Sequence, residues 1–120
     1  MGYRNYTSLM YGVFVPETDA KSIAGKYYKN GCFLYPGIPD NLWVELISDG
    51  TDSRAENLHY EPGYMHYLGI VITDDAKDLV QKIQNPPADL AENFAKYVKA
   101  IMDEFNIKGD PSLQTYNQTI

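Results

Sequence analysis

Apolar and polar positions alternate with two different periods along the chain, and the alternation predicts both strands and helices. Residues 9–15 place apolar side chains on both faces of an extended segment, which is typical of a central strand covered on two sides. Residues 42–47 and 64–72 are similar short apolar runs. We therefore predict three strands in the first two thirds of the chain.

Three other segments have apolar residues at helical spacing, three or four positions apart. Thr18 or Asp19 would cap the first, which ends at Asn30-Gly31, and residues 73–75 would cap the second. The third begins at a Pro-Pro pair, and Gly109 is its natural C-terminal stop. The apolar positions are Ala20, Ile23, Ala24 and Tyr27, then Ala76, Leu79, Val80 and Ile83, and finally Leu90, Phe94, Tyr97, Val98, Ile101, Met102 and Phe105.

The order of these elements predicts an α+β fold, in which two or three helices pack on one face of a small, mostly antiparallel sheet. Residues 12–15 and 69–72 are similar Gly-led apolar segments, and an Asp-Ala-Lys sequence follows each. A duplicated strand–helix–strand unit would give a ferredoxin-like sandwich. The alternative is that a strand followed by an Asp-capped helix is simply common. We assign residues 1–109 to one domain, and residues 110–120 to a tail that either frays or adds an edge strand.

The composition of the chain indicates where the protein is located and which classes of partner it does not bind. A net charge of −6 argues against direct nucleic-acid binding, which usually needs a basic surface. No apolar run approaches the ~18 residues of a membrane span. The N-terminus lacks the apolar core of a signal peptide, and the single cysteine, Cys32, cannot form an internal disulfide. We expect a cytoplasmic protein that binds neither nucleic acid nor a membrane.

The best candidates for a metal site are His59, Glu61 and His66, with Cys32 joining from elsewhere, because imidazole, carboxylate and thiolate are zinc ligands. Their spacing matches no established ligand motif, and a Pro-Gly turn interrupts them, so two histidines beside aromatic neighbours are the simpler interpretation. A cysteine in an apolar run is likewise more typical of packing than of a nucleophile. We therefore expect no metal, no other cofactor and no catalytic residues. A minor enzymatic role built on His59, His66 and nearby carboxylates is a further alternative.

Negative charge and tyrosine are both prominent in the middle of the chain. Residues 40–78 hold nine acidic side chains against two basic ones, and the chain has 11 tyrosines. Tyrosine supplies large contact areas with a hydrogen-bonding tip, and a negative surface steers basic partners. We therefore predict a non-catalytic interaction protein, of the immunity or phage anti-defence type, that binds a basic surface of another protein; an ordinary solubilising face is the alternative. The expected contact residues are Asp49, Asp52, Glu56, Tyr60, Glu61, Tyr64 and Tyr67.

A small-molecule-binding domain is the alternative function. The residues expected to stack on a planar, nucleotide-like ring are Trp43, Tyr60, Tyr64 and Tyr67. Lys26, Lys29 or Arg54 would hold an anionic group. The apolar stripe of the last predicted helix could also serve a subunit interface. A homo-oligomer is therefore an alternative to a purely intramolecular core.

Overall fold

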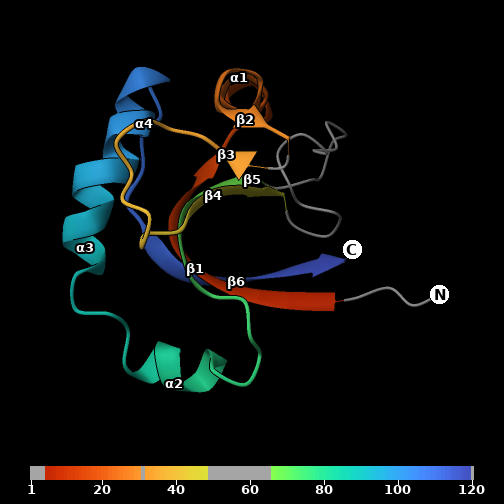
Figure 1. The fold of residues 1–120 in the computed structure, drawn as a ribbon, viewed down its shortest axis with the longest axis vertical. Coiled ribbons are helices and arrows are strands. Elements are labelled where there is room, and N and C mark those ends of the chain that lie inside the picture. The colour runs from red at the N-terminus through yellow and green to blue at the C-terminus, as the bar shows by residue number, and fades with distance from the viewer. Residues whose placement is uncertain (1–4, 31, 49–65, 120) are drawn as a thin grey trace.

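A four-stranded antiparallel sheet forms the centre of the structure, a computed structural model that describes residues 5–30, 32–48 and 66–119 (Figure 1). The strands lie in the order β4-β5-β1-β6, and a short hairpin of β2 and β3 forms a separate two-stranded sheet. The strands are β1 (Asn5–Val15), β2 (Tyr28–Lys29), β3 (Cys32–Phe33), β4 (Val44–Ser48), β5 (His66–Thr73) and β6 (Ser112–Thr119).

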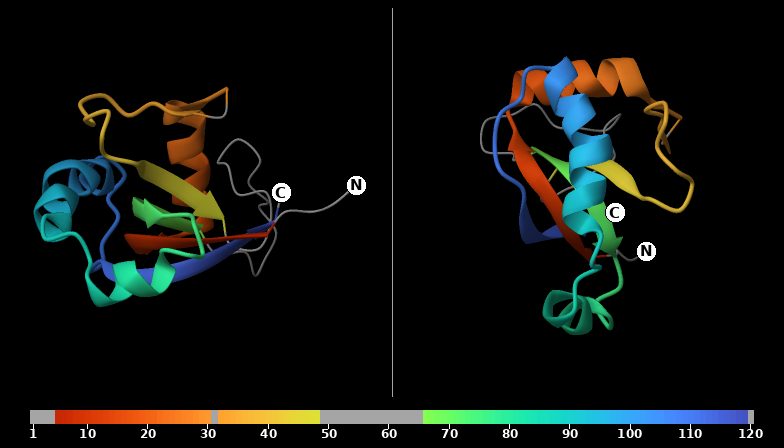
Figure 2. Two further views of the ribbon diagram at one scale, coloured as in Figure 1. Left: turned by 60° about the horizontal axis from the view of Figure 1, so that its bottom comes forward. Right: turned by 90° about the vertical axis from the view of Figure 1, so that its left-hand side faces the viewer.

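Helices link the strands and cover one face of the sheet. The helix α1 (Glu17–Tyr27) follows β1, and α2 (Leu79–Gln84) follows β5. A longer helix then leads into β6; its parts are α3 (Leu90–Asn93), the π-helical segment η2 (Phe94–Val98) and α4 (Lys99–Glu104). Figure 2 shows this long helix lying across the sheet, with α2 apart from it. Element order and strand order together give the split β-α-β arrangement of a ferredoxin-like sandwich, which confirms the predicted α+β class.

The main core fills the space between the sheet and the helices. Alternate residues of β1 and β4 point into it, among them Val13, Val15, Val44 and Leu46. The apolar stripe predicted for the last helix also packs there, so it serves the protein's own core. Its buried members are Leu90, Phe94, Val98, Ile101 and Met102.

The π-helical segment explains how this stripe stays on one side. Leu90, Phe94, Val98 and Met102 follow one another at intervals of four residues. In a regular α-helix of about 3.6 residues per turn, each step of four rotates the next side chain about 40° further round. The wider turns of the π-helical segment reduce that rotation, because its hydrogen bonds span five residues. All four side chains therefore remain buried.

Two glycines let the two central strands, β1 and β5, approach each other closely. Gly12 of β1 pairs with Gly69 of β5, and a Cβ built on either would lie less than 3.0 Å from a carbonyl oxygen of the opposite strand. Residues without side chains let the two backbones approach this closely. The strands of the sheet are strongly curved (Figure 1), and a second apolar cluster lines the face away from the main core. This cluster consists of Met10, Ile47, Tyr67, Val71 and Tyr116.

The similarity between residues 12–15 and 69–72 holds for the strands and not for the helices. Gly12 and Gly69 are equivalent in the two segments and pair with each other, so a local twofold axis passes between them. After β1, α1 buries three residues against the sheet, whereas after β5, α2 buries none. Val80 of α2 is 63% exposed, which corrects the expectation that its apolar stripe meets the core.

Several predicted element ends also differ from the observed ones. The helix α1 begins directly after Pro16, ahead of the predicted caps, and Pro16 makes no side-chain cap hydrogen bond. Asn30, with φ 54°, lies in the turn between β2 and β3 instead of ending α1. The last helix ends at Glu104, where Asn106 adopts φ 56° ahead of Gly109. The segment after Gly109 contributes the edge strand β6, the second of the two predicted alternatives.

Candidate functional site: a pocket at the edge of β4

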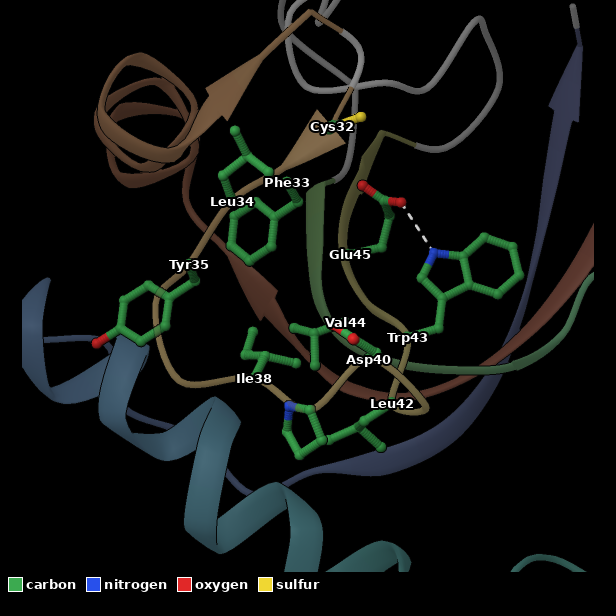
Figure 3. A pocket seen from close by; sticks show the side chains of 11 residues that line it. Cys32, Phe33, Leu34, Tyr35, Ile38, Asp40, Leu42, Trp43, Val44 and Glu45 are labelled. Carbon is green, nitrogen blue, oxygen red and sulfur yellow. Dashed lines mark hydrogen bonds between the residues drawn. The ribbon is translucent and has the colours of Figure 1, made fainter.

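A pocket of about 440 Å³ opens at the outer edge of β4 (Figure 3). Its lining residues all belong to the segment 32–45, which runs from β3 into β4. Pro36, Pro39 and Gly37, whose φ is 89°, keep this connection out of regular structure. Ile38 and Leu42 pack against the main core and hold the connection in place. The pocket is therefore built by one continuous, anchored segment.

Glu45 supplies a buried carboxylate at this pocket. Its side chain is 5% exposed and accepts hydrogen bonds from Trp43 Nε1 at 3.0 Å and from the Tyr28 hydroxyl at 2.8 Å. Figure 3 shows the first of these as a dashed line. Burying a carboxylate is costly unless it is hydrogen-bonded, and the two donors offset that cost. They also fix the direction in which both carboxylate oxygens point.

Trp43 supplies an exposed aromatic surface next to this carboxylate. The side chain is 41% exposed although its indole N–H is held by Glu45. Trp43 and Glu45 are two positions apart, so they project from the same side of the chain as it enters β4, while Val44 points into the main core. The result is a fixed indole ring and a fixed carboxylate side by side at the pocket.

The charge of the pocket is negative among its lining residues. Asp40 and Glu45 are both acidic, and the segment 32–45 contains no lysine or arginine. Phe33, Tyr35 and aliphatic side chains form the rest of the lining. Such a pocket favours an uncharged or cationic group over an anion.

Lys26, one of the predicted anion-binding residues, is not among the lining residues of this pocket. Its Nζ forms an ion pair of 2.7 Å with Glu104, and the hydroxyl of Tyr27 donates to the same carboxylate at 2.6 Å. These hydrogen bonds raise the pKa of Lys26 and lower the pKa of Glu104. The group joins the C-terminal ends of α1 and α4. Arg54, the other predicted cation, lies outside the described residues.

Most of the predicted partner-contact residues also lie outside the described residues; these are Asp49, Asp52, Glu56, Tyr60, Glu61 and Tyr64. Tyr67 is described, and it is 7% exposed. Its ring lies 4.0 Å from the ring of Tyr116 between centroids, within the second apolar cluster. Little of its surface is left for a partner. The tyrosines whose side chains are described are all buried or half-buried, namely Tyr11, Tyr27, Tyr28, Tyr35, Tyr67, Tyr97 and Tyr116.

Of the four candidate metal ligands, the structure describes two, His66 and Cys32. His59 and Glu61 lie outside the described residues, and His66 is buried at the start of β5. Burial lowers the pKa of His66, while the charge of Glu17 acts in the opposite direction. Cys32 is exposed and lines the β4 pocket. Within residues 5–30, 32–48 and 66–119, no three His, Cys, Asp or Glu side chains gather into a metal site.

No helix in this part of the chain is long and apolar enough to cross a membrane.

The sequence reasoning missed Glu45 and Tyr28 as parts of the site. The signal for Glu45 was a single acidic residue inside the apolar run 42–47, two positions after the only tryptophan. A lone charge in a buried strand needs a hydrogen-bonding partner, so it indicates a site. Tyr28 left no such signal, because its contact with Glu45 depends on how the β2–β3 hairpin folds back towards β4.

The fold and the pocket define a small α+β sandwich with an aromatic, acidic site at one edge of its sheet. Comparisons with models of protein families, with curated proteins and with solved structures found no match.

Proposed function

We propose that the protein binds a small planar compound, uncharged or cationic and of the nucleoside kind, in the pocket at the edge of β4. One observation carries the proposal: the exposed indole of Trp43 lies beside the buried carboxylate of Glu45, which fixes it by a hydrogen bond. An indole face stacks on heteroaromatic rings, and a carboxylate accepts hydrogen bonds from ring or exocyclic N–H groups. The volume of about 440 Å³ is in the range typical of small-molecule sites.

Charge favours a nucleoside over a nucleotide. Asp40 and Glu45 would repel a phosphate group, and Lys26 is committed to Glu104 away from the pocket. A neutral or protonated base avoids this repulsion and uses the carboxylate as its acceptor. The sequence alone suggested a nucleotide-like ligand. The charge of the pocket restricts this proposal to a nucleoside, which has a base and a sugar but no phosphate.

Trp43 is the only tryptophan, so its fluorescence reports directly on the pocket. The experiment is a titration with adenosine, guanosine and cytidine, each compared with its 5′-monophosphate. We expect at least one nucleoside to quench the emission saturably, and its monophosphate to bind more weakly. Absence of any saturable change, or tighter binding of the monophosphates, would contradict the proposal.

Two variants separate stacking from hydrogen bonding, with binding measured by calorimetry because one of them removes the fluorophore. Glu45→Gln keeps the size of the side chain and loses its charge, and we expect about a tenfold loss of affinity. Trp43→Ala removes the stacking surface and should lose more. Val80→Ala, on the exposed side of α2, is the matched control and should bind like the wild type.

A second candidate function is the interaction with a basic protein surface, supported by the balance of nine acidic to two basic side chains in residues 40–78. Reversing Asp49, Asp52 and Glu56 to lysine should slow association with such a partner strongly at low salt. Reversing Asp89, Glu92 and Asp103 changes the net charge by the same amount outside this region and should slow it far less. Equal rates for the two triple variants would remove this candidate.

A further inference from the structure

The outer edge of β6 shows, among the described residues, none of the usual protections of a sheet edge. The strand covers Ser112–Thr119, and these eight residues include no charged residue and no proline. It pairs with β1 in continuous register from Asn5 opposite Thr119 to Gly12 opposite Ser112. Within the described residues, no strand pairs with its other side. A long, regular and uncharged edge therefore ends the sheet.

Such an edge carries a row of backbone N–H and C=O groups that can pair with another strand. Proteins commonly prevent this pairing with short edge strands, charges, prolines or bulges. The opposite edge strand, β4, has five residues, contains Glu45 and has the β2–β3 hairpin hydrogen-bonded beside it through Tyr28. In the part of the chain that the structure describes, the sheet is thus protected at the β4 edge and not at the β6 edge.

The side chains at this edge also lack cover. Leu113 of β6 is 38% exposed, and Thr115 is exposed on the same side of the strand. Leu113 lies opposite Tyr11 of β1, which packs against the main core, and Thr115 lies opposite Leu9. Since both side chains of β6 are nevertheless exposed, the helices that cover the sheet leave this part of β6 uncovered. An additional strand at this edge would bury apolar surface of Leu113.

We infer that β6 is the dimerisation edge of this protein, where β6 of a second copy pairs antiparallel with it and joins the two sheets. Antiparallel pairing of a strand with itself satisfies the same backbone groups on both copies around a twofold axis, the commonest symmetry of homodimers. The chain has a net charge of −6, so two copies repel each other, and an uncharged strand brings them together without placing like charges in contact.

This dimer is independent of the proposed ligand and compatible with it. Because β4 and β6 are opposite edges of one sheet, pairing through β6 places the two pockets at the far ends of the joined sheet. Both pockets stay open. Failure of the dimer therefore leaves the proposed nucleoside site untouched, and the reverse also holds.

The test is sedimentation velocity of the full chain over a range of micromolar concentrations. We expect the wild type to approach twice its mass of 13.6 kDa. The double variant Leu113→Lys/Thr115→Lys places like charges along the self-paired strand and should weaken the dimer by at least about tenfold. The control Leu34→Lys/Val80→Lys makes two comparable changes at exposed apolar positions away from β6 and should dimerise like the wild type.

Hydrogen exchange of the wild type provides a second test that needs no variant. We expect the amides of Ser112–Thr119 to become more protected as the protein concentration rises, while those of α2 do not change. A wild type that stays monomeric overturns the proposal, even if β6 then binds an unrelated extended peptide. A dimer that the β6 double variant leaves intact, with no protection gained at β6, overturns it as well.

Discussion

The two edges of the sheet, β4 and β6, are related by the local twofold axis between Gly12 and Gly69, yet they differ in length, in charge and in what lies beside them. β4 is short, contains the buried charge of Glu45 and lies beside a hairpin. β6 is longer, uncharged and unpaired on its outer side within the described residues. One edge suits a small molecule, and the other suits a strand.

The difference originates in the connections that precede the two strands. Residues 28–43 join α1 to β4, and they form the β2–β3 hairpin and the proline-containing segment that lines the pocket. Residues 105–111 join α4 to β6 directly and contain no strand. A longer connection thus converts an edge into a pocket, because its side chains lie where a neighbouring strand would pair. The shorter connection leaves the equivalent edge open.

The largest expected loss of stability follows from a substitution at the Gly12–Gly69 pair, which joins the two halves of the sheet. A Cβ on Gly69 would meet the backbone of Tyr11, so Gly69→Ala should destabilise the protein by about 3 kcal/mol. Gly25→Ala is the control, because nothing lies within 4 Å of the added atom in α1, and it should stabilise by about 0.5 kcal/mol. Urea denaturation measures both. Equal stabilities of the two variants would mean that the close approach is not needed.

The central strands and the last helix could be predicted from the sequence, because the spacing of apolar residues indicates which side chains are buried. The two-faced apolar run at residues 9–15 identified the central strand, and the similarity between residues 12–15 and 69–72 marked two segments that are both strands. That these two strands pair with each other was not predicted. The last helix was also correct in position. These features depend on side chains that are close in sequence or repeated in it.

The connections were harder to predict, because several structures share one local pattern. Asn30-Gly31 fits a helix end and a hairpin equally well, since both need a residue with positive φ. The apolar spacing of α2 fits a core helix, but the chain after β5 leaves the sheet and Val80 stays exposed. The pocket depends on Tyr28 reaching Glu45 across the hairpin, and no spacing rule encodes that contact.

Substitutions that remove the hydrogen bonds of Glu45 at the β4 edge should cause a smaller loss of stability than Gly69→Ala. Glu45→Leu removes the acceptor of the Tyr28 hydroxyl and of the Trp43 indole N–H, and we expect a loss of about 2 kcal/mol. Tyr28→Phe removes only the Tyr28 donor and should cost less, about 1 kcal/mol. Thermal denaturation in dilute solution measures both. A Glu45→Leu protein as stable as the wild type would show that the hydrogen bonds of the β4 edge contribute nothing.

Low pH should reduce the free energy of unfolding through His66. This residue lies at the start of β5, where its strand partner on β4 is Ser48. Burial holds the pKa of His66 below its ordinary value of 6.5, so the unfolded chain binds the proton more readily than the folded one. This contribution to stability is therefore complete above pH 6.5 and is lost as the pH falls towards the lowered pKa. Urea midpoints on either side of that pH should differ for the wild type and much less for His66→Leu. Parallel curves for the two proteins would exclude His66 as the cause.

The smallest expected effect is at β6. Thr115 is exposed, so Thr115→Lys should change the stability of the dilute monomer by less than about 0.5 kcal/mol. The wild-type urea midpoint should rise with protein concentration, because dimerisation stabilises the folded state by mass action, while the midpoint of the variant should stay constant. A variant that is already unstable in dilute solution would place Thr115 in the monomer's own packing. Equal concentration dependence of both proteins would move the dimer contact away from β6, and the two edges would no longer differ in the way proposed.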